Sequence, residues 1–280
     1  MASWSSIAAL FGLLAAASWG TGDFCGGLAT KRSPGYSVVT ATEFVGAFLL
    51  IALALITGEA WPDGRSIWFS IAAGLAGLLG LGSLYQGLAV GRMGVIAPLS
   101  ALIGAVIPVA VGLFTAGWPD RMTLIGFAVA LLAVWLLAGT GDFRPTRRDL
   151  ILAGLAGIGF GFYYVLVAYA GEGGLYWTLT IARFAAGIAF LLFLLATRRP
   201  LLPKRSAWGL VGVSGMADVG GNIFYLLATQ FGRMDVAAVL SSLFPGMTVL
   251  LARVFLDERL TRLQIVGVAA ALIAVTLIAG

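Results

Sequence analysis

Histidine is absent from the 280-residue sequence, and this absence excludes several kinds of catalytic site. Without imidazole the chain cannot build a Ser-His-Asp triad, a histidine metal site or a haem site held by histidine. The single cysteine, Cys25, can form neither an internal disulfide nor a Cys/His zinc cluster. The only lysines, Lys31 and Lys204, do not follow a glycine-rich phosphate loop, so there is no P-loop ATPase. Any energy-requiring activity must therefore draw on a gradient.

Charge is also scarce. Charged residues make up 10% of the chain and hydrophobic residues 60%, whereas soluble domains carry about 25% and about 45–50%. Residues 66–91, 93–119, 122–141 and 150–171 form uncharged stretches, each longer than the roughly 18 apolar residues that mark a membrane-spanning helix. The composition therefore excludes an ordinary soluble enzyme and predicts an all-α polytopic membrane protein.

Hydropathy and turn-forming residues divide the chain into ten predicted transmembrane helices. The connections between them are too short to hold a soluble domain. No basic segment precedes the first helix, so we expect it to be retained rather than cleaved as a signal. The predicted helices cover residues 4–28, 36–57, 67–91, 94–116, 122–140, 149–170, 175–197, 207–231, 235–256 and 262–280.

Basic residues are distributed unevenly among the loops. Thirteen lie between helices 1–2, 3–4, 5–6, 7–8 and 9–10, and three lie on the opposite side. Because cytoplasmic loops collect Lys and Arg, we predict a bacterial inner (plasma) membrane protein with both termini outside the cytoplasm. The net charge of +5 is then a result of topology. We expect no nucleic-acid partner, since no basic run is long enough to follow a phosphate backbone.

A shift of 141 residues superimposes the two halves of the sequence. It aligns the Gly-Arg-Met triplet at residues 91–93 with the same triplet at 232–234 and continues without a gap to Gly139 and Gly280. Five helices per half is an odd number, so the second half must be inverted relative to the first. Inverted repeats are a recurring transporter plan, with the substrate site near mid-membrane where the halves meet. We predict two such repeats, residues 1–141 and 142–280, around a central cavity.

A set of residues in both halves has a familiar spacing. Pro245 is followed thirteen residues later by Glu258 and then by the segment RLTRLQIVG at 259–267, while Trp19 and Arg183 lie inside helices 1 and 7. Over this duplicated ten-helix length the chain resembles the EamA-type transporters of the drug/metabolite transporter superfamily. The resemblance implies a central cavity lined by helices 1–4 and 6–9, with helices 5 and 10 at the periphery. It also implies export or exchange of small metabolites, amino acids prominent among them.

Three charged residues lie well inside predicted helices: Glu43, Arg183 and Asp218. An ionised side chain near the bilayer centre costs at least roughly 2.5–3.5 kcal/mol on insertion scales, so it usually faces a cavity or a partner. One interpretation is a structural ion pair. The other is a substrate site, in which Glu43 and Arg183, at equivalent positions in the two halves, receive the ammonium and carboxylate of a zwitterion. Glu43 and Asp218 are also the candidates for proton coupling, since histidine is absent.

Polar and aromatic side chains on other helices extend this candidate site. Asp218, Asn222 and Tyr225 recur at helical spacing and share one face of helix 8, and Trp19 shares a face of helix 1 with Asp23. The deep aromatic residues line the cavity or serve as core packing. The predicted cavity-lining set is Trp19, Glu43, Ser83, Tyr85, Gln86, Tyr163, Tyr164, Arg183, Asp218, Asn222 and Tyr225.

Prolines interrupt two of the predicted cavity-lining helices. Pro108 lies inside helix 4 and Pro245 inside helix 9, where each removes a backbone hydrogen bond. Each proline is a candidate hinge, with a fixed bend as the alternative.

The function that fits these features best is secondary transport, gradient-driven or facilitative. We predict export or exchange of small metabolites, above all amino acids, by alternating access, with no enzymatic activity, cofactor or metal. A small-molecule substrate and the lipid bilayer are the expected partners, and a monomer is the working assumption. One alternative is a solute or ion channel, which would need a continuous polar lining. The other is a membrane-embedded enzyme using Glu43 and Asp218 as acid and base, which lacks a nucleophile or cofactor motif.

Overall fold

The computed structural model describes residues 2–89, 93–137, 146–256 and 261–279, and within these segments the chain is helical apart from short connections and contains no strand. The predicted all-α membrane architecture is confirmed. The helices are α1 (Ala2–Thr30), α2 (Gly35–Thr57), α3 (Gly64–Ala89), α4 (Met93–Ala116), α5 (Arg121–Leu137), α6 (Arg147–Ala170), α7 (Tyr176–Ala196), α8 (Trp208–Phe231), α9 (Met234–Ser241), α10 (Phe244–Phe255) and α11 (Arg262–Ala279).

Helix lengths match a bilayer. Within the described part of the chain, nine segments are long and apolar enough to cross a membrane when α9 and α10 are taken together, and α5 is a shorter apolar helix of 17 residues. A span of about 17–25 residues suffices for a hydrocarbon core about 30 Å thick. Together these account for the ten predicted spans.

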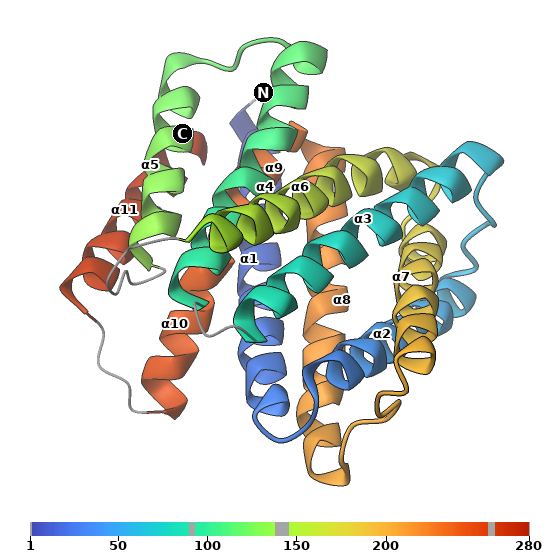
Figure 1. The fold of residues 1–280 in the computed structure, drawn as a ribbon. Helices are drawn as coiled ribbons and strands as arrows, with labels where there is room; N and C mark the ends of the chain where they lie inside the picture. Colours follow the sequence, from blue (N-terminus) through green and yellow to red (C-terminus); the bar gives the residue numbers. More distant parts are fainter. Residues whose placement is uncertain (1, 90–92, 138–145, 257–260, 280) are drawn as a thin grey trace.

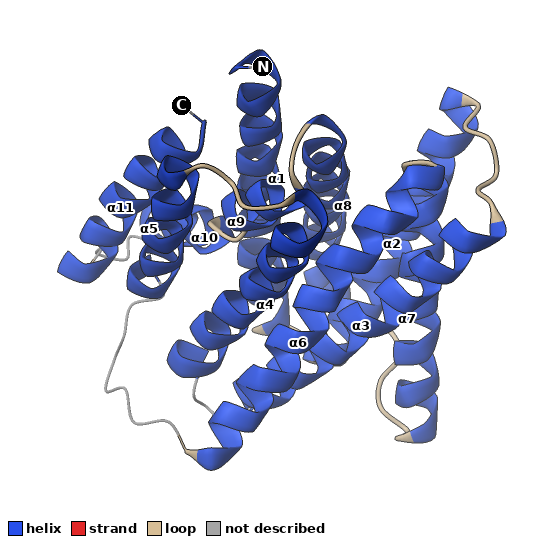
Figure 2. Ribbon diagram, turned by 90° about the horizontal axis from the view of Figure 1, so that it is seen from above, coloured by secondary structure: helices blue, strands red, loops and turns tan. Residues whose placement is uncertain are grey.

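Helix pairing repeats between the two halves. α1 packs along α8 just as α6 packs along α3, and α4 contacts α6 as α9 and α10 contact α1 (Figures 1 and 2). α2 pairs with α7, and α5 with α11, so these elements pair with their own counterparts. This pattern is that of a pseudo-twofold axis relating inverted halves, and both termini lie at one end of the molecule (Figure 1). The predicted boundary between residues 141 and 142 lies outside the described residues.

Polar side chains cap the N-termini of α5 and α6. The Asp120 carboxylate accepts hydrogen bonds from the Thr123 hydroxyl at 2.6 Å and from the Met122 and Thr123 amides at 2.8 and 3.1 Å. The Thr123 hydroxyl and the amides together hold the pKa of Asp120 below its usual range. At α6, Thr146 and Asp149 cap each other's backbone amides reciprocally. These caps satisfy amides that have no partner in the first turn.

The ninth predicted span is two helices rather than one. α9 ends at Ser241, and α10 begins at Phe244 with Pro245 in its first turn. The turn between them is closed by hydrogen bonds from Ser242 N to Ala238 O at 2.9 Å and from Leu243 N to Leu240 O at 3.2 Å. The predicted span over 235–256 is confirmed as one membrane crossing, but it is made of two helices rather than one kinked helix. Proline has no amide hydrogen, which suits it to starting a helix but not to continuing one.

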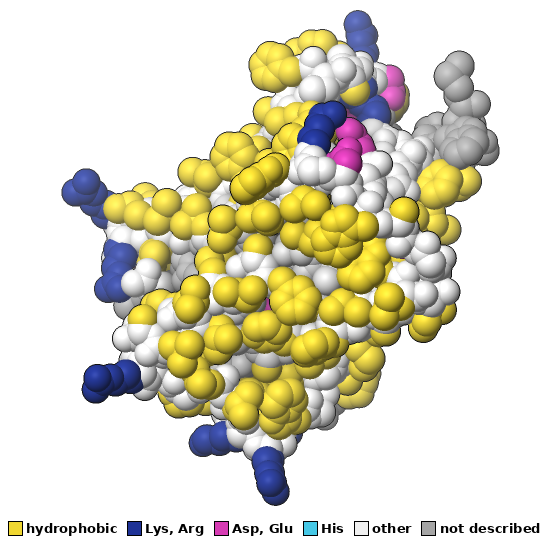
Figure 3. All heavy atoms as spheres, turned by 90° about the vertical axis from the view of Figure 1, so that its right-hand side faces the viewer, with side chains coloured by type: hydrophobic (Ala, Val, Ile, Leu, Met, Phe, Trp, Pro, Cys, Tyr) yellow, Lys and Arg dark blue, Asp and Glu magenta, His cyan; other side chains and the backbone are white. Residues whose placement is uncertain are grey.

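The outer surface of the bundle is apolar. Figure 3 shows a face on which hydrophobic side chains form a broad band, while Lys and Arg project from its left, lower and upper margins. Phe114 is 91% exposed and Ile56 is 81% exposed, which in water would be costly and in lipid is favourable. This surface is that of a protein surrounded by acyl chains.

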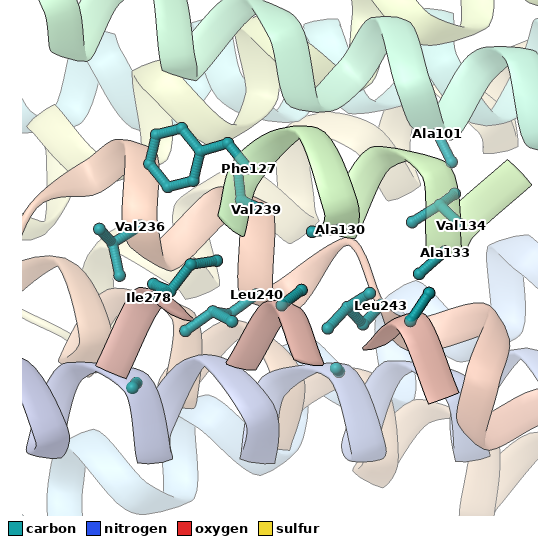
Figure 4. Close-up of a cluster of buried hydrophobic side chains, with 14 residues drawn as sticks. Ala101, Phe127, Ala130, Ala133, Val134, Val236, Val239, Leu240, Leu243 and Ile278 are labelled. Atoms are coloured by element: carbon teal, nitrogen blue, oxygen red, sulfur yellow. The ribbon is translucent and has the colours of Figure 1, made fainter. Parts of the chain in front are cut away.

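The peripheral pair of helices is held by a buried hydrophobic cluster. Phe127 and Val134 of α5 and Ile278 of α11 pack with Leu240 of α9 and Ala101 of α4 (Figure 4). α5 and α11 otherwise contact mainly each other, at one side of the molecule (Figure 1). The remaining helices of the two halves are therefore the ones that surround the charged residues.

Candidate functional site

Arg183 of α7 joins two carboxylates from two other helices. Its side chain is almost completely buried, its Nη1 lies 3.2 Å from Oε2 of Glu43 in α2, and its Nη2 hydrogen-bonds to Oδ2 of Asp218 in α8. Glu43 is buried, whereas the side chain of Asp218 is 39% exposed. The three charged residues identified inside predicted helices thus form one cluster, which we call the Arg183 cluster. It spans the contact between the two halves.

Small residues make room for the guanidinium of Arg183. A Cβ added at Gly46 would lie 2.8 Å from Nη1 and 3.0 Å from Nε of Arg183, so the guanidinium rests directly against the backbone of α2. Among the described residues, Nε of Arg183 finds no hydrogen-bond partner. Nη1 and Nη2 of Arg183 are therefore paired with carboxylates, and Nε lies against the backbone of α2 at Gly46.

A second hydrogen-bond network ties α6 to α8 beside the Arg183 cluster. The amide nitrogen of Asn222 donates to the backbone carbonyl of Asp218 at 2.8 Å, and the Tyr163 hydroxyl donates to Oδ1 of Asn222. The Tyr225 hydroxyl donates to the carbonyl of Tyr164 at 3.1 Å. Each buried polar group here has a partner, so the network fixes the orientation of the side chains around the charges.

Aromatic rings pack next to this network. The Trp19 ring centroid lies 5.5 Å from that of Tyr164 and 5.9 Å from that of Tyr225, and the two tyrosine rings are 5.1 Å apart. Gly221 of α8 admits the indole, since a Cβ there would lie 2.4 Å from the Trp19 ring. We call Trp19, Tyr163, Tyr164 and Tyr225 the aromatic cluster. It forms a wall shared by α1, α6 and α8.

Asp23 is a charged residue of this region that we did not include in the predicted site. It lies four residues after Trp19 and so on the same face of α1, which turns toward the aromatic cluster. Its side chain is exposed, and it accepts no hydrogen bond among the described residues, although its carboxylate is close enough to repel that of Asp218.

The remaining predicted site residues lie in α3. Ser83 is buried and Gln86 is exposed, and neither hydrogen-bonds to the Arg183 cluster within the described part of the chain. The side chain of Tyr85 lies outside the described residues. Of the two candidate hinges, Pro108 lies within the continuous helix α4, and Pro245 lies just after the break between α9 and α10.

Arg233, which is partly exposed, forms a second ion pair with a buried carboxylate that sequence analysis missed. Its Nε lies 3.0 Å from Oδ1 of Asp235, and its Nη1 and Nη2 donate to the carbonyls of Ala116 and Gly117 at 3.0 and 2.6 Å. Asp235 is fully buried and packs against Gly112 of α4. This Arg233 clamp joins the start of α9 to the end of α4.

Glu59 makes a comparable connection at the start of α7. Its carboxylate accepts hydrogen bonds from the amides of Leu175, Tyr176 and Trp177, the last two at 2.7 and 3.0 Å. The indole of Trp177 returns a hydrogen bond to the carbonyl of Glu59 at 3.0 Å. The loop after α2 therefore caps the N-terminus of α7, where the helix dipole favours a negative charge.

The described residues contain no group of three or more His, Cys, Asp or Glu placed to hold a metal ion. The site instead offers charge pairs, amide and hydroxyl groups and aromatic faces, which bind a small molecule without covalent chemistry.

Comparison with known proteins agrees with this arrangement. The model of the EamA-like transporter family matches residues 6–139 and again residues 148–280. A crystal structure of a protein 20% identical to this chain superimposes with a TM-score of 0.79 and covers 96% of this chain and 95% of its own. At that identity the likeness is one of fold. No curated protein sequence matches the chain.

Proposed function

We propose that this chain, which belongs to the EamA-like transporter family, is a secondary transporter that exports or exchanges small metabolites, amino acids above all, by alternating access. Family membership makes it a multi-pass membrane transporter of the drug/metabolite type with a small-molecule substrate. Members of this family are transporters rather than enzymes. The observation that carries the proposal is the Arg183 cluster, buried within membrane-spanning helices between the two halves.

The geometry suits a ligand that competes for existing ion pairs. Arg183 holds α7 to α2 through Glu43 and to α8 through Asp218. A ligand ammonium can take over one of these carboxylates, and a ligand acceptor can take over a guanidinium hydrogen bond. Exchange at Glu43 weakens a contact between helices of opposite halves, and exchange at Asp218 weakens a contact within the second half. Ligand binding is thereby linked to the packing of the halves, as alternating access requires.

Coupling to protons would use the same contacts. Glu43 and Asp218 are the carboxylates that hold Arg183, and protonation of either would remove one of the attractions. Histidine is absent, so carboxylates are the groups available for such a switch. Uptake into liposomes that follows an imposed pH gradient would support proton coupling, whereas pH-independent counterflow would indicate facilitated exchange.

The thirteen-to-three distribution of basic loop residues supports an orientation in a bacterial inner membrane. The loops between α1 and α2 and between α7 and α8 would face the cytoplasm, and both termini would lie outside. A reporter that is active only outside the cytoplasm is expected to be active when it is fused after Gly280. The opposite result would reverse the orientation and leave the fold unaffected.

Counterflow in liposomes tests the transport proposal. Purified protein is reconstituted with a saturating internal amino acid, and entry of labelled amino acids and related amines is followed. Saturable entry that accelerates with internal substrate is expected. Arg183→Leu should abolish it, whereas Arg65→Leu, which removes an exposed arginine 4.0 Å from Glu172, should not. Flux that is linear in concentration and indifferent to internal substrate would instead identify a channel.

A further inference from the structure

Gly46 lies inside α2 at the point where this helix meets the guanidinium of Arg183. It follows Glu43 by three residues and therefore lies on the same face of the helix. A Cβ added at Gly46 would lie 2.8 Å from Nη1, 2.9 Å from Cζ and 3.0 Å from Nε of Arg183. Side chains do not pack at such distances, so the guanidinium occupies the space that a side chain at position 46 would need.

The contacts at Gly46 fall on one part of the guanidinium. Nη1, the atom nearest to an added Cβ, is also the nitrogen that pairs with Glu43 at 3.2 Å. Nη2, which pairs with Asp218, lies farther from that position than Nη1, Cζ and Nε. A methyl group at position 46 would therefore displace the part of Arg183 that contacts Glu43 and leave Nη2 beside Asp218.

The surroundings of Arg183 leave its guanidinium little room to adapt. The side chain of Arg183 is 6% exposed and that of Glu43 is 10% exposed. The obstructed atoms form the end of a side chain, so a methyl group would move the guanidinium before it moved α7 away from α2. Alanine is otherwise the better residue inside a helix, so helix formation alone does not require glycine here.

We infer that Gly46 is a positioning residue: its lack of a side chain keeps the Arg183 guanidinium within reach of Glu43 and Asp218 at once. This inference rests on the proposed transport function, because it treats the Arg183 cluster as the substrate site. Gly46 acts through Arg183 rather than through contact with a ligand. With a methyl group at position 46, Arg183 remains paired with Asp218 in the second half and loses Glu43 in the first. The ion pair between the halves is then missing.

Alanine substitutions at two glycines of the α2–α7 contact test the inference. Gly46→Ala should lower initial counterflow about tenfold, the effect of losing one hydrogen bond to a charged group, and should lower the thermal unfolding midpoint of the full-length protein in detergent. The matched control is Gly187→Ala, one helical turn after Arg183, where an added Cβ would meet Glu43 and Phe44 at an ordinary 3.4 Å. It should change both measurements little. Equal losses in the two variants, or no loss in either, would overturn the inference.

Double variants show whether Gly46 acts through the guanidinium. Leucine ends before the atoms that an added methyl group would meet, so Gly46→Ala in an Arg183→Leu background should leave the unfolding midpoint unchanged or raise it. In a Glu43→Gln background Gly46→Ala should cost less than in the unmodified chain, because the contact that it breaks is already weakened. In an Asp218→Asn background it should cost at least as much. The same loss in all backgrounds would identify a packing glycine and overturn the inference.

The Arg183→Leu background also decides the outcome if Gly46→Ala alone yields no folded protein. Recovery of folded protein in the double variant would attribute the clash to the guanidinium and support the inference. Failure of the double variant, with Arg183→Leu folded, would assign Gly46 to helix packing and overturn it. If Arg183→Leu does not fold either, the Arg183 cluster is structural and the inference fails with it.

Unfolding midpoints separate this inference from the transport proposal, because they require no flux. Coupling of Gly46 to Arg183 and Glu43 in the double variants, without counterflow by the unmodified protein, would leave the positioning role standing and reject the transport function. Counterflow by the unmodified protein that Gly46→Ala leaves intact would do the reverse. Counterflow that is lost in Gly46→Ala and kept in Gly187→Ala, together with this coupling, would support both.

Discussion

Arg183 and Arg233 are both paired with buried carboxylates, yet their surroundings differ. Arg233 uses all three nitrogens, on a fully buried Asp235 and on the carbonyls of Ala116 and Gly117, which are fixed at the end of α4. Arg183 uses two nitrogens, leaves Nε without a partner among the described residues, and shares its charge with an Asp218 that solvent can reach.

The difference indicates two roles for the same side chain. All three nitrogens of Arg233 already have acceptors that the protein backbone or Asp235 supplies, so a ligand has no weak contact to replace. Breaking the pair leaves a charge without its partner. A guanidinium divided between two carboxylates can exchange one of them at lower cost when that carboxylate is already hydrated. We therefore assign structure to the Arg233 clamp and ligand exchange to the Arg183 cluster.

The largest effect is expected when the guanidinium of Arg183 is removed. Arg183→Leu should reduce counterflow about a hundredfold or more, because the ligand would lose a charged partner worth about 2–5 kcal/mol of binding free energy. Glu43→Gln should reduce counterflow less, since Asp218 still holds the guanidinium. The measurement is initial counterflow per folded protein, with folded yield from size-exclusion chromatography. Loss of all folded protein in both variants would make the Arg183 cluster structural instead.

The Arg233 clamp should respond in the opposite way. Asp235→Asn removes the charged partner of the partly exposed Arg233 guanidinium and should lower the free energy of unfolding by about 1.5–3 kcal/mol, which thermal unfolding in detergent would detect. Protein that remains folded at low temperature should retain much of its ligand affinity. The control Glu172→Gln, at an exposed pair, should change stability little. Unchanged melting in Asp235→Asn would contradict the structural role.

Pro245 tests whether the break between α9 and α10 takes part in gating. Pro245→Ala restores an amide donor and should let the two helices join, so turnover should fall several-fold while substrate affinity survives. Cysteines placed near the start of α9, in a background lacking Cys25, would report altered access to an impermeant thiol reagent. Pro108→Ala, within the continuous helix α4, provides the matched comparison. Unchanged turnover and labelling would make Pro245 a fixed bend.

The smallest effect is expected outside the membrane-spanning helices, at the cap of α5. Hydrogen bonds from Thr123 and Met122 hold the pKa of Asp120 below its usual range, so its ionised form stabilises the folded state. That contribution is present above about pH 4 and is lost as the pH falls through the lowered pKa. Asp120→Asn should therefore melt slightly earlier than the unmodified chain at pH 7, with the difference shrinking on acidification. A difference independent of pH would argue against this cap.

The sequence predicted the parts of the molecule that depend on local patterns. Apolar runs set the spans because a buried backbone in lipid must be helical. Glu43, Arg183 and Asp218 were identifiable because each charge interrupts such a run, and a shift of 140 residues placed Glu43 opposite Arg183. Asp23 was overlooked because it lies nearer the end of its span, where a charge costs little.

The contacts that sequence missed join segments far apart in the chain. Glu59 reaches Tyr176 across 117 residues, and Arg233 reaches the Ala116 carbonyl across the same distance. The partner in each contact is a backbone amide or carbonyl. Every residue has these groups, so the residue types do not reveal the contact. The break at Ser242 was also hidden, since Pro245 is compatible with either a kink or a new helix.

The clamp at Arg233 has no copy in the first half, and this makes the duplicated halves energetically unequal. The 141-residue shift pairs Arg233 with Arg92 but pairs Asp235 with Gly94, which has no side chain to offer. The position equivalent to Asp235 in the first half therefore has no carboxylate to form the same pair. Every 1.4 kcal/mol of that difference is a factor of about ten in the resting populations of the two facing states. Under the proposed alternating access, the Arg233–Asp235 pair would favour the state in which the helices that it joins stay together.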